Sequence, residues 1–133
     1  MSELFSEDWM KALKDEWNND PEVSDALAAI GFNSVIGCGF KDGETVGVFV
    51  VEQGVCTSAG AYNGEELDWD MRADKKNWMK WVSKGIGMGG LGMAYASGKL
   101  KFFKGDFGAM MKNPKMAGPF VKSFGLMKNI PTT

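Results

Sequence analysis

The sequence contains no histidine and only two cysteines, Cys38 and Cys56. Without an imidazole, a serine or cysteine nucleophile has no histidine base, and no histidine serves as a general acid or base. Two cysteines without histidine are also too few for a zinc site or for a disulfide framework. We therefore expect no histidine-dependent catalysis and no metal site.

Long apolar runs are missing as well. No stretch of about 18 apolar residues is present, so we expect no segment to span a membrane. Residues 1–8 have neither the basic region nor the apolar region of a secretory signal. Residues 130–133 match no prenylation or peroxisomal signal. These features predict a cytoplasmic protein.

The composition is that of an ordinary globular chain. Its 133 residues, 44% hydrophobic and 24% charged, predict one domain over residues 1–133. The 10 methionines either fill an irregular core or line an adaptable pocket. Residues 1–66 hold 13 acidic and 3 basic residues, whereas residues 67–133 hold 4 acidic and 12 basic ones. The two halves either form an acidic and a basic face or interleave so that their charges pair.

Two helices are predicted at the N-terminus. Apolar residues recur every four positions along residues 6–18, with Ser6 as the expected N-cap. A second, short helix is expected to begin at Asp20-Pro21 and to end at Gly31.

A three-stranded antiparallel meander is predicted next. Its strands are rich in Val, Phe, Ala and Gly and cover residues 32–40, 45–52 and 55–62. The dipeptides Asp-Gly at 42–43 and Gln-Gly at 53–54 indicate two-residue hairpin turns between them.

These turns define a strand register. They pair Phe40 with Thr45 and Phe49 with Ser58, and they place the two cysteines on non-adjacent strands, too far apart for a disulfide. Neither face of the resulting sheet is polar. We therefore expect helices, a ligand or a partner subunit to cover both faces.

The second half of the chain mixes strands and amphipathic helices. A half-buried strand is expected at 67–73, and Asp74 is expected to cap a helix with the apolar stripe Trp78, Trp81 and Val82. The later elements are a strand at 99–104, a short helix with Met110 and Met111, and a final helix with the stripe Met116, Phe120, Phe124 and Met127.

Two motifs allow a functional interpretation. Gly85 to Gly90 satisfies G-x-G-x-x-G, but it follows a helix instead of a strand, so we do not expect dinucleotide binding. We expect a helix end there, followed by a helix whose glycines allow close packing. Asp68 and Asp70 share a strand face and could form an acid–base pair, but we favour a solvated strand face.

One segment resembles a known family. Ser97-Gly98-Lys99-Leu100-Lys101-Phe102, followed by Gly105-Asp106 and the apolar residues 107–111, is similar to the G-K-L-K-[apolar]-x-G-D segment of the sterol carrier protein-2 domain, with Phe103 as an additional residue. The order of the predicted elements also resembles that family over nearly the whole chain.

The resemblance implies an α+β fold with a five-stranded, mainly antiparallel sheet, covered by helices and enclosing an apolar cavity. It implies non-catalytic binding or transfer of a lipid-like ligand, such as a fatty acid, a fatty acyl-CoA or a sterol-like molecule, without a cofactor. The C-terminal helix would be the lid. The residues expected near the cavity are Trp78, Trp81, Phe102, Met110, Met111, Phe120, Phe124 and Met127. Basic residues expected at the rim, to meet the head group, are Arg72, Lys99 and Lys101.

Several alternatives stay open. The chain could instead be a non-catalytic dimerisation module or an accessory subunit of a lipid- or hydrocarbon-metabolising enzyme system, with no open cavity. The glycine-rich segment 85–93 could either widen or close the tunnel. A monomer and a homodimer both fit the sequence, as does transient contact with an anionic membrane surface, but nucleic-acid binding is not expected.

Overall fold

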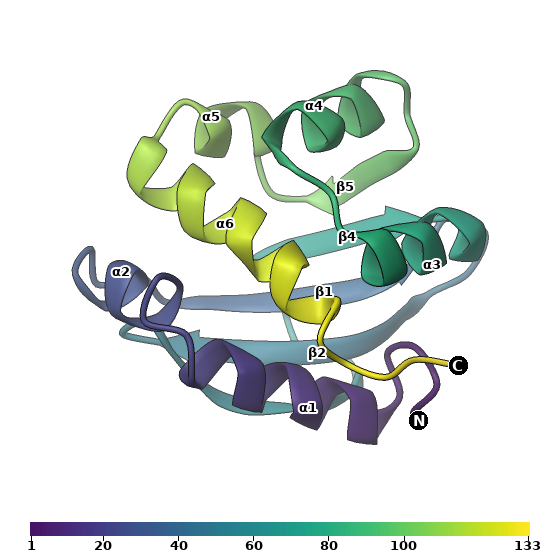
Figure 1. The fold of residues 1–133 in the computed structure, drawn as a ribbon, viewed down its shortest axis with the longest axis horizontal. Helices are drawn as coiled ribbons and strands as arrows, with labels where there is room; N and C mark the ends of the chain where they lie inside the picture. Colours follow the sequence, from purple (N-terminus) through teal and green to yellow (C-terminus); the bar gives the residue numbers. More distant parts are fainter.

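The computed structural model describes all 133 residues, Met1–Thr133, as an α+β fold with helices on one five-stranded sheet (Figure 1). The elements follow the chain in the order α1 (Glu7–Asn18), α2 (Ser24–Ala28), β1 (Ser34–Phe40), β2 (Thr45–Glu52), β3 (Val55–Ala61), β4 (Trp69–Ala73), α3 (Lys75–Lys84), α4 (Met88–Ala96), β5 (Leu100–Lys104), α5 (Phe107–Met111) and α6 (Pro114–Met127). The strand order is β3-β2-β1-β4-β5, and only β1 and β4 pair in parallel. The predicted fold class and element order are confirmed. None of the helices combines the length and the apolar character needed to cross a membrane.

The N-terminal helices form largely as predicted. The Ser6 hydroxyl accepts a hydrogen bond from the Trp9 amide (3.3 Å) and so caps α1, whose apolar stripe is buried against the sheet. The second helix is expected from Asp20, but α2 begins at Ser24. Residues 21–23 form a turn that the Asp20 carboxylate caps through the Glu22 amide (2.9 Å) and that continues into α2 through the bond from the Ser24 amide to the Asp20 carbonyl (2.9 Å). Gly31 ends that segment with a φ of 63°, a left-handed conformation that favours glycine.

The hairpin between β2 and β3 has the predicted turn but not the predicted register along its whole length. Val51 pairs with Cys56, as expected from the two-residue turn. A bulge between Val50 and Val51 then shifts the pairing, so that Phe49 faces Ala59 and not Ser58. The shift has a physical reason: it turns Ala59 toward the core and leaves Ser58 in solvent.

The hairpin between β1 and β2 has a wider turn than predicted. Thr45 pairs with Gly39 and not with Phe40, because the register shifts after Cys38. A guanidinium nitrogen of Arg72 donates to the Gly43 carbonyl inside this turn (2.9 Å). Within the loop the Gly43 N–H donates to the Phe40 carbonyl (3.2 Å), so Arg72 adds a contact from a distant position to a turn that also closes locally.

The helices pack over one face of the sheet and bury an aromatic cluster (Figure 1). The Phe5 ring lies edge-on to Trp9 and Trp78, with centroids 5.3 and 5.0 Å away, and Trp78 stacks on Phe124 at 6.0 Å. The Trp78 indole N–H donates to the Gly39 carbonyl (2.8 Å), so this buried side chain is also satisfied as a donor. The cluster links α1, α3 and α6 to the centre of the sheet.

No helix covers the opposite face of the sheet. Of the three kinds of cover expected for it, helices, a ligand or a partner subunit, helices are therefore excluded. The connection from β3 to β4 (residues 62–68) crosses this face instead, and Leu67 lies so close to Gly37 that a Cβ there would collide with it. Asp70 and Arg72 are buried on the same face. The face is therefore less apolar than the sequence pattern suggests.

The glycine-rich segment 85–93 ends α3 and begins α4. Gly85 has a φ of 78°, which confirms the expected helix end. The expected close packing is wrong for Gly87 and Gly89, because a Cβ on either would meet no atom within 4 Å. None of the residues of this segment lines the pocket described below, so the segment neither widens nor closes it.

Candidate functional site

An apolar pocket lies between the helices and the sheet face that they cover. It has a volume of about 50 Å³, and 12 of its 13 lining residues are hydrophobic. They come from α1, α2, β1, β2, β4, α5 and α6 and from the loop after α2: Leu13, Trp17, Leu27, Phe32, Ile36, Phe49, Trp69, Met71, Met110, Met116, Phe120, Ser123 and Met127. The pocket is thus built where seven of the eleven elements of the fold converge.

Two tryptophan rings of the pocket wall are held in place by contacts on the side that faces away from the pocket. Trp17 lies edge-on to Phe49 (centroids 5.4 Å apart), and its indole N–H donates to the Gly54 carbonyl (2.9 Å). Trp69 lies edge-on to Phe102 at 5.8 Å, so a second aromatic ring supports it from outside the pocket. Because their polar or outer edges are fixed, these rings present apolar surface to the pocket.

The pocket offers no free polar group to a ligand. Its one polar lining residue, Ser123, already donates its hydroxyl hydrogen to the Phe120 carbonyl (2.6 Å) within α6. No buried side-chain nitrogen or oxygen in the molecule lacks a hydrogen-bond partner. Such a site recognises apolar surface and shape and not hydrogen-bonding pattern.

The structure brings some of the predicted cavity residues to the pocket and places others behind it. Met110, Phe120 and Met127 line the pocket. Trp78, Trp81 and Phe124 belong to the packed core instead. Phe102 lies behind Trp69 and contacts its ring from outside the pocket. Met111 packs on the small cluster around Phe107.

Sequence reasoning missed the part of the wall that comes from the first half of the chain. Trp17 was on the predicted apolar stripe of the first helix, and Ile36 and Phe49 were on one predicted sheet face. These signals mark residues as buried, but they do not separate a pocket wall from an ordinary core.

The three basic residues expected at the rim lie elsewhere. Arg72 and Lys101 pair across β4 and β5 on the sheet face away from the pocket. Lys99 lines a surface groove between α3 and α4. The alternation of side chains along a strand explains the difference for Arg72, because its neighbour Met71 is the residue that faces the pocket.

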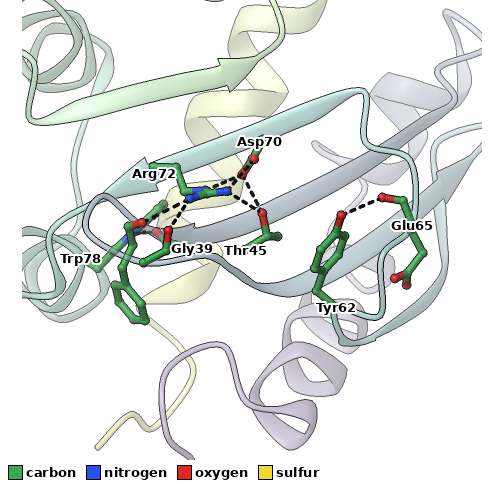
Figure 2. A network of polar contacts seen from close by, with 9 residues as sticks. Gly39, Thr45, Tyr62, Glu65, Asp70, Arg72 and Trp78 are labelled. Carbon is green, nitrogen blue, oxygen red and sulfur yellow. Dashed lines mark hydrogen bonds and ion pairs between the residues drawn. The ribbon is translucent and has the colours of Figure 1, made fainter.

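A polar network surrounds Arg72 on that far face (Figure 2). Its guanidinium donates to both carboxylate oxygens of Asp70 (2.8 and 2.9 Å), to the Thr45 hydroxyl (3.0 Å) and to the Gly43 carbonyl. Its cationic centre lies 4.4 Å from the centroid of the Phe103 ring. The expectation that Asp70 is solvated is wrong, because its side chain is only 10% exposed and is fully paired with Arg72. Both oxygens of the Asp70 carboxylate are thus occupied by the Arg72 guanidinium.

The two cysteines are separate and buried. Neither forms a disulfide, as expected from their non-adjacent strands. Burial raises the pKa of the Cys38 thiol to about 12, and the negative charge of Asp70 adds to this effect. Burial also raises the pKa of the Cys56 thiol to about 11.

We expect both thiols to resist modification in the folded protein. At about pH 8 almost no thiolate is present at either site, and the thiolate is the reactive form. An aromatic disulfide reagent should therefore label neither cysteine until denaturant is added, when both should react. Rapid labelling of the native protein would contradict the buried placement.

Few groups are available elsewhere for metal binding. No three Asp, Glu, His or Cys side chains come together where a metal ion could be held. Asp68, the other candidate acid, lies outside β4, and its carboxylate accepts a hydrogen bond from the Val35 amide (2.8 Å).

Comparison with solved structures identifies the architecture. A crystal structure of sterol carrier protein 2 superposes with a TM-score of 0.78, at 20% identity over 97% of this chain and 100% of that chain. The chain has the sterol carrier protein-2 fold. A possible sterol carrier protein from Thermus thermophilus superposes with a TM-score of 0.71, at 23% identity over 100% of this chain and 93% of that one. A ubiquinone synthesis protein described as UbiJ-SCP2 gives a TM-score of 0.59, at 16% identity over 92% of this chain and 90% of that one.

The sequence itself matches no family model and no curated protein. The resemblance noted in residues 97–111 is nevertheless confirmed at the level of the sterol carrier protein-2 fold. The fold also explains two residues of that segment. A Cβ on Gly105 would collide with the Trp69 ring at the pocket wall, and the Asp106 carboxylate caps α5 by accepting from the Ala109 amide (2.9 Å).

Proposed function

We propose that the chain binds and carries a lipid-like ligand, with its apolar part in the pocket between the sheet and α6. The observation that carries this proposal is the lining itself: apolar side chains from seven elements converge on one space, without a free polar group. Each Å² of apolar ligand surface that leaves water would contribute about 25 cal/mol before the costs of ordering. A fatty acid, a fatty acyl-CoA or a sterol-like molecule has the required apolar part.

The pocket must widen to hold such a ligand. Its volume of about 50 Å³ is well below the roughly 300–1,000 Å³ of sites that hold drug-sized molecules. We propose that the start of α6 moves outward as the lid. Met116 and Phe120 there are only partly buried, and Pro119 between them has no N–H to bond to the Lys115 carbonyl, which weakens this part of the helix. A flexible acyl chain demands less widening than a rigid fused-ring sterol, so we favour an acyl ligand.

The comparisons support this proposal through the fold alone. Two of the structures are described as sterol carrier proteins or possible sterol carrier proteins. The ubiquinone synthesis protein is compatible with a role as accessory subunit but does not favour it. We further propose that the protein acts in a reducing compartment such as the cytoplasm, in keeping with its two free thiols.

A single polar substitution in the pocket tests the proposal. Met116→Gln keeps the length of the side chain but replaces apolar surface of the pocket wall with an amide, whose hydration a bound acyl chain would have to displace at a cost of about 1–3 kcal/mol. We expect the affinity for a long-chain fatty acid, measured by displacement of a fluorescent acyl analogue, to fall about tenfold or more.

Met111→Gln is the matched control. Met111 packs on the same small cluster as Met116 but does not line the pocket. Its substitution should leave the affinity nearly unchanged. Equal affinities for the wild type and both variants would exclude this pocket as the binding site, and absence of any acyl binding by the wild type would contradict the proposed function.

A further inference from the structure

Helix α4 leaves an uncharged, apolar surface exposed. Residues 85–98 contain no charged side chain, and only Leu91 and Ala94 of α4 are buried. Met93 is 75% exposed, Met88 51% and Tyr95 45%. At about 100° per residue, Met88 and Tyr95 lie along one edge of α4, roughly 140–160° around the helix from Met93.

Packing does not require the small residues on this surface. A Cβ on Gly89 or Gly92 would meet no atom within 4 Å, although glycine weakens a helix interior. With a helical rotation of about 100° per residue, both glycines share the outward side of α4 with Met93. The outward side is therefore smooth, apolar and free of hydrogen-bonding side chains.

Positive charge surrounds this helix. Residues 75–133 contain 11 lysines and one acidic residue, Asp106. Of these lysines, only Lys122 forms ion pairs, with Asp20 and Glu22. Lys80 and Lys99 line a groove of about 340 Å³ between α3 and α4, together with the polar Asn77 and Ser97.

The acidic residues of α1 lie at the other side of the molecule. α1 packs on the edge strand β3, whereas α4 packs on the opposite edge strand β5 (Figure 1). The exposed face of α1 carries Glu7, Asp8 and Asp15. The acidic helix α1 and the lysines around α4 therefore lie toward opposite edges of the sheet. Asp42 and Glu44 are exposed in the hairpin between β1 and β2, whose Lys41 ammonium donates to the Gly98 carbonyl (3.0 Å). The pairs made by Lys122 are the ion pairs that join the two halves of the chain.

We propose that α4 and the groove beside it dock on the surface of an anionic phospholipid bilayer. The outward side of α4 enters the interfacial layer with Met93. Met88 and Tyr95 flank it at the edge away from the groove, and Lys80 and Lys99 bind lipid phosphates in the groove. An apolar helix face flanked by lysines, with an aromatic residue at its edge, has the composition that suits this interface. A convex surface without polar side chains fits a bilayer better than an acidic protein partner. The proposal does not depend on the pocket.

The position of α4 also relates the docking surface to the pocket. Tyr95 stacks on Phe107 with ring centroids 4.4 Å apart, and Phe107 lies edge-on to Phe120 of the lid at 6.1 Å. A bilayer bound at α4 is thus separated from the pocket wall by one aromatic layer.

Sedimentation with phospholipid vesicles tests the proposal. We expect the protein to bind vesicles of equimolar phosphatidylcholine and phosphatidylglycerol, and to bind vesicles of phosphatidylcholine alone much more weakly. Met93→Glu should weaken binding to the anionic vesicles at least about tenfold, because it places a charge in the inserted face. The double variant Lys80→Gln/Lys99→Gln should weaken binding about 30-fold and reduce its dependence on salt.

Val55→Glu is the matched control for charge. Val55 is 46% exposed and begins β3 at the far edge of the sheet, so this variant should bind like the wild type. Circular dichroism should show all variants folded, since the substituted side chains are exposed. Equal binding by Met93→Glu and Val55→Glu, or no binding of the wild type to anionic vesicles, would overturn the proposal. Met116→Gln should bind vesicles like the wild type. A loss of fatty-acid binding in the pocket can therefore be distinguished from a loss of membrane docking at α4.

Discussion

Replacing Arg72 with methionine is expected to destabilise the folded protein by about 3–5 kcal/mol, because removal of one partner leaves the buried Asp70 carboxylate without its counter-charge. The guanidinium also holds the Gly43 carbonyl in the turn between β1 and β2 and satisfies the Thr45 hydroxyl. Urea denaturation followed by tryptophan fluorescence measures the free energy of unfolding of the variant and of the wild type.

The double variant Asp70→Leu/Arg72→Met separates the charge effect from loss of packing. It removes both charges and leaves apolar side chains on a partly apolar face, so most of the lost stability should return. A double variant as unstable as Arg72→Met would contradict this explanation. It would mean that the contacts of Arg72 with the turn, and not its pairing with Asp70, supply the stability.

Trp78→Ala is expected to cost about 3–5 kcal/mol as well, through a different mechanism. Its side chain is 0% exposed, contacts Phe5, Trp81 and Phe124, and donates to the Gly39 carbonyl. Truncation leaves a large cavity at the point where α1, α3 and α6 meet the sheet. The same denaturation experiment measures the effect.

Two further variants show which part of Trp78 matters. Trp78→Phe keeps much of the aromatic packing but removes the N–H donor, so it should be intermediate. Phe103→Ala removes an aromatic ring that is 54% exposed and should change stability much less than Trp78→Ala. A loss below about 1 kcal/mol for Trp78→Ala would show that this cluster does not hold the helices on the sheet.

Local signals in the sequence predicted the elements of the fold well. Ser6 caps the first helix, Gly31 and Gly85 end helical segments, and Gln53-Gly54 forms a two-residue turn, because each of these depends on neighbours in the sequence. The predictions of strand register and turn width were wrong where contacts between residues distant in the sequence determine the structure. The bulge beside Val50 changes which residues of β3 face the core, and Arg72 donates a hydrogen bond to the turn between β1 and β2. A strand pattern predicts neither of these tertiary contacts.

The pocket was predicted only in part for the same reason. Periodicity identifies Phe120 and Met127 as one helix stripe, but the space in front of them is completed by Trp17 and Phe49 from the first half of the chain. The alternation along residues 67–73 already placed Arg72 on the face opposite Trp69 and Met71, but the sequence did not show that the face with Trp69 and Met71 lines the pocket.

The most direct test of the proposed function is a titration of the protein, labelled with carbon-13 on its methionine methyl groups, with a long-chain fatty acid below its aggregation concentration. We predict shifted NMR signals for the methionines of the pocket, Met71, Met110, Met116 and Met127. The signals of the exposed Met1, Met88 and Met93 should stay in place. Binding that shifts only these exposed methionines, or no shift of any signal, would contradict a ligand in the pocket between the sheet and α6.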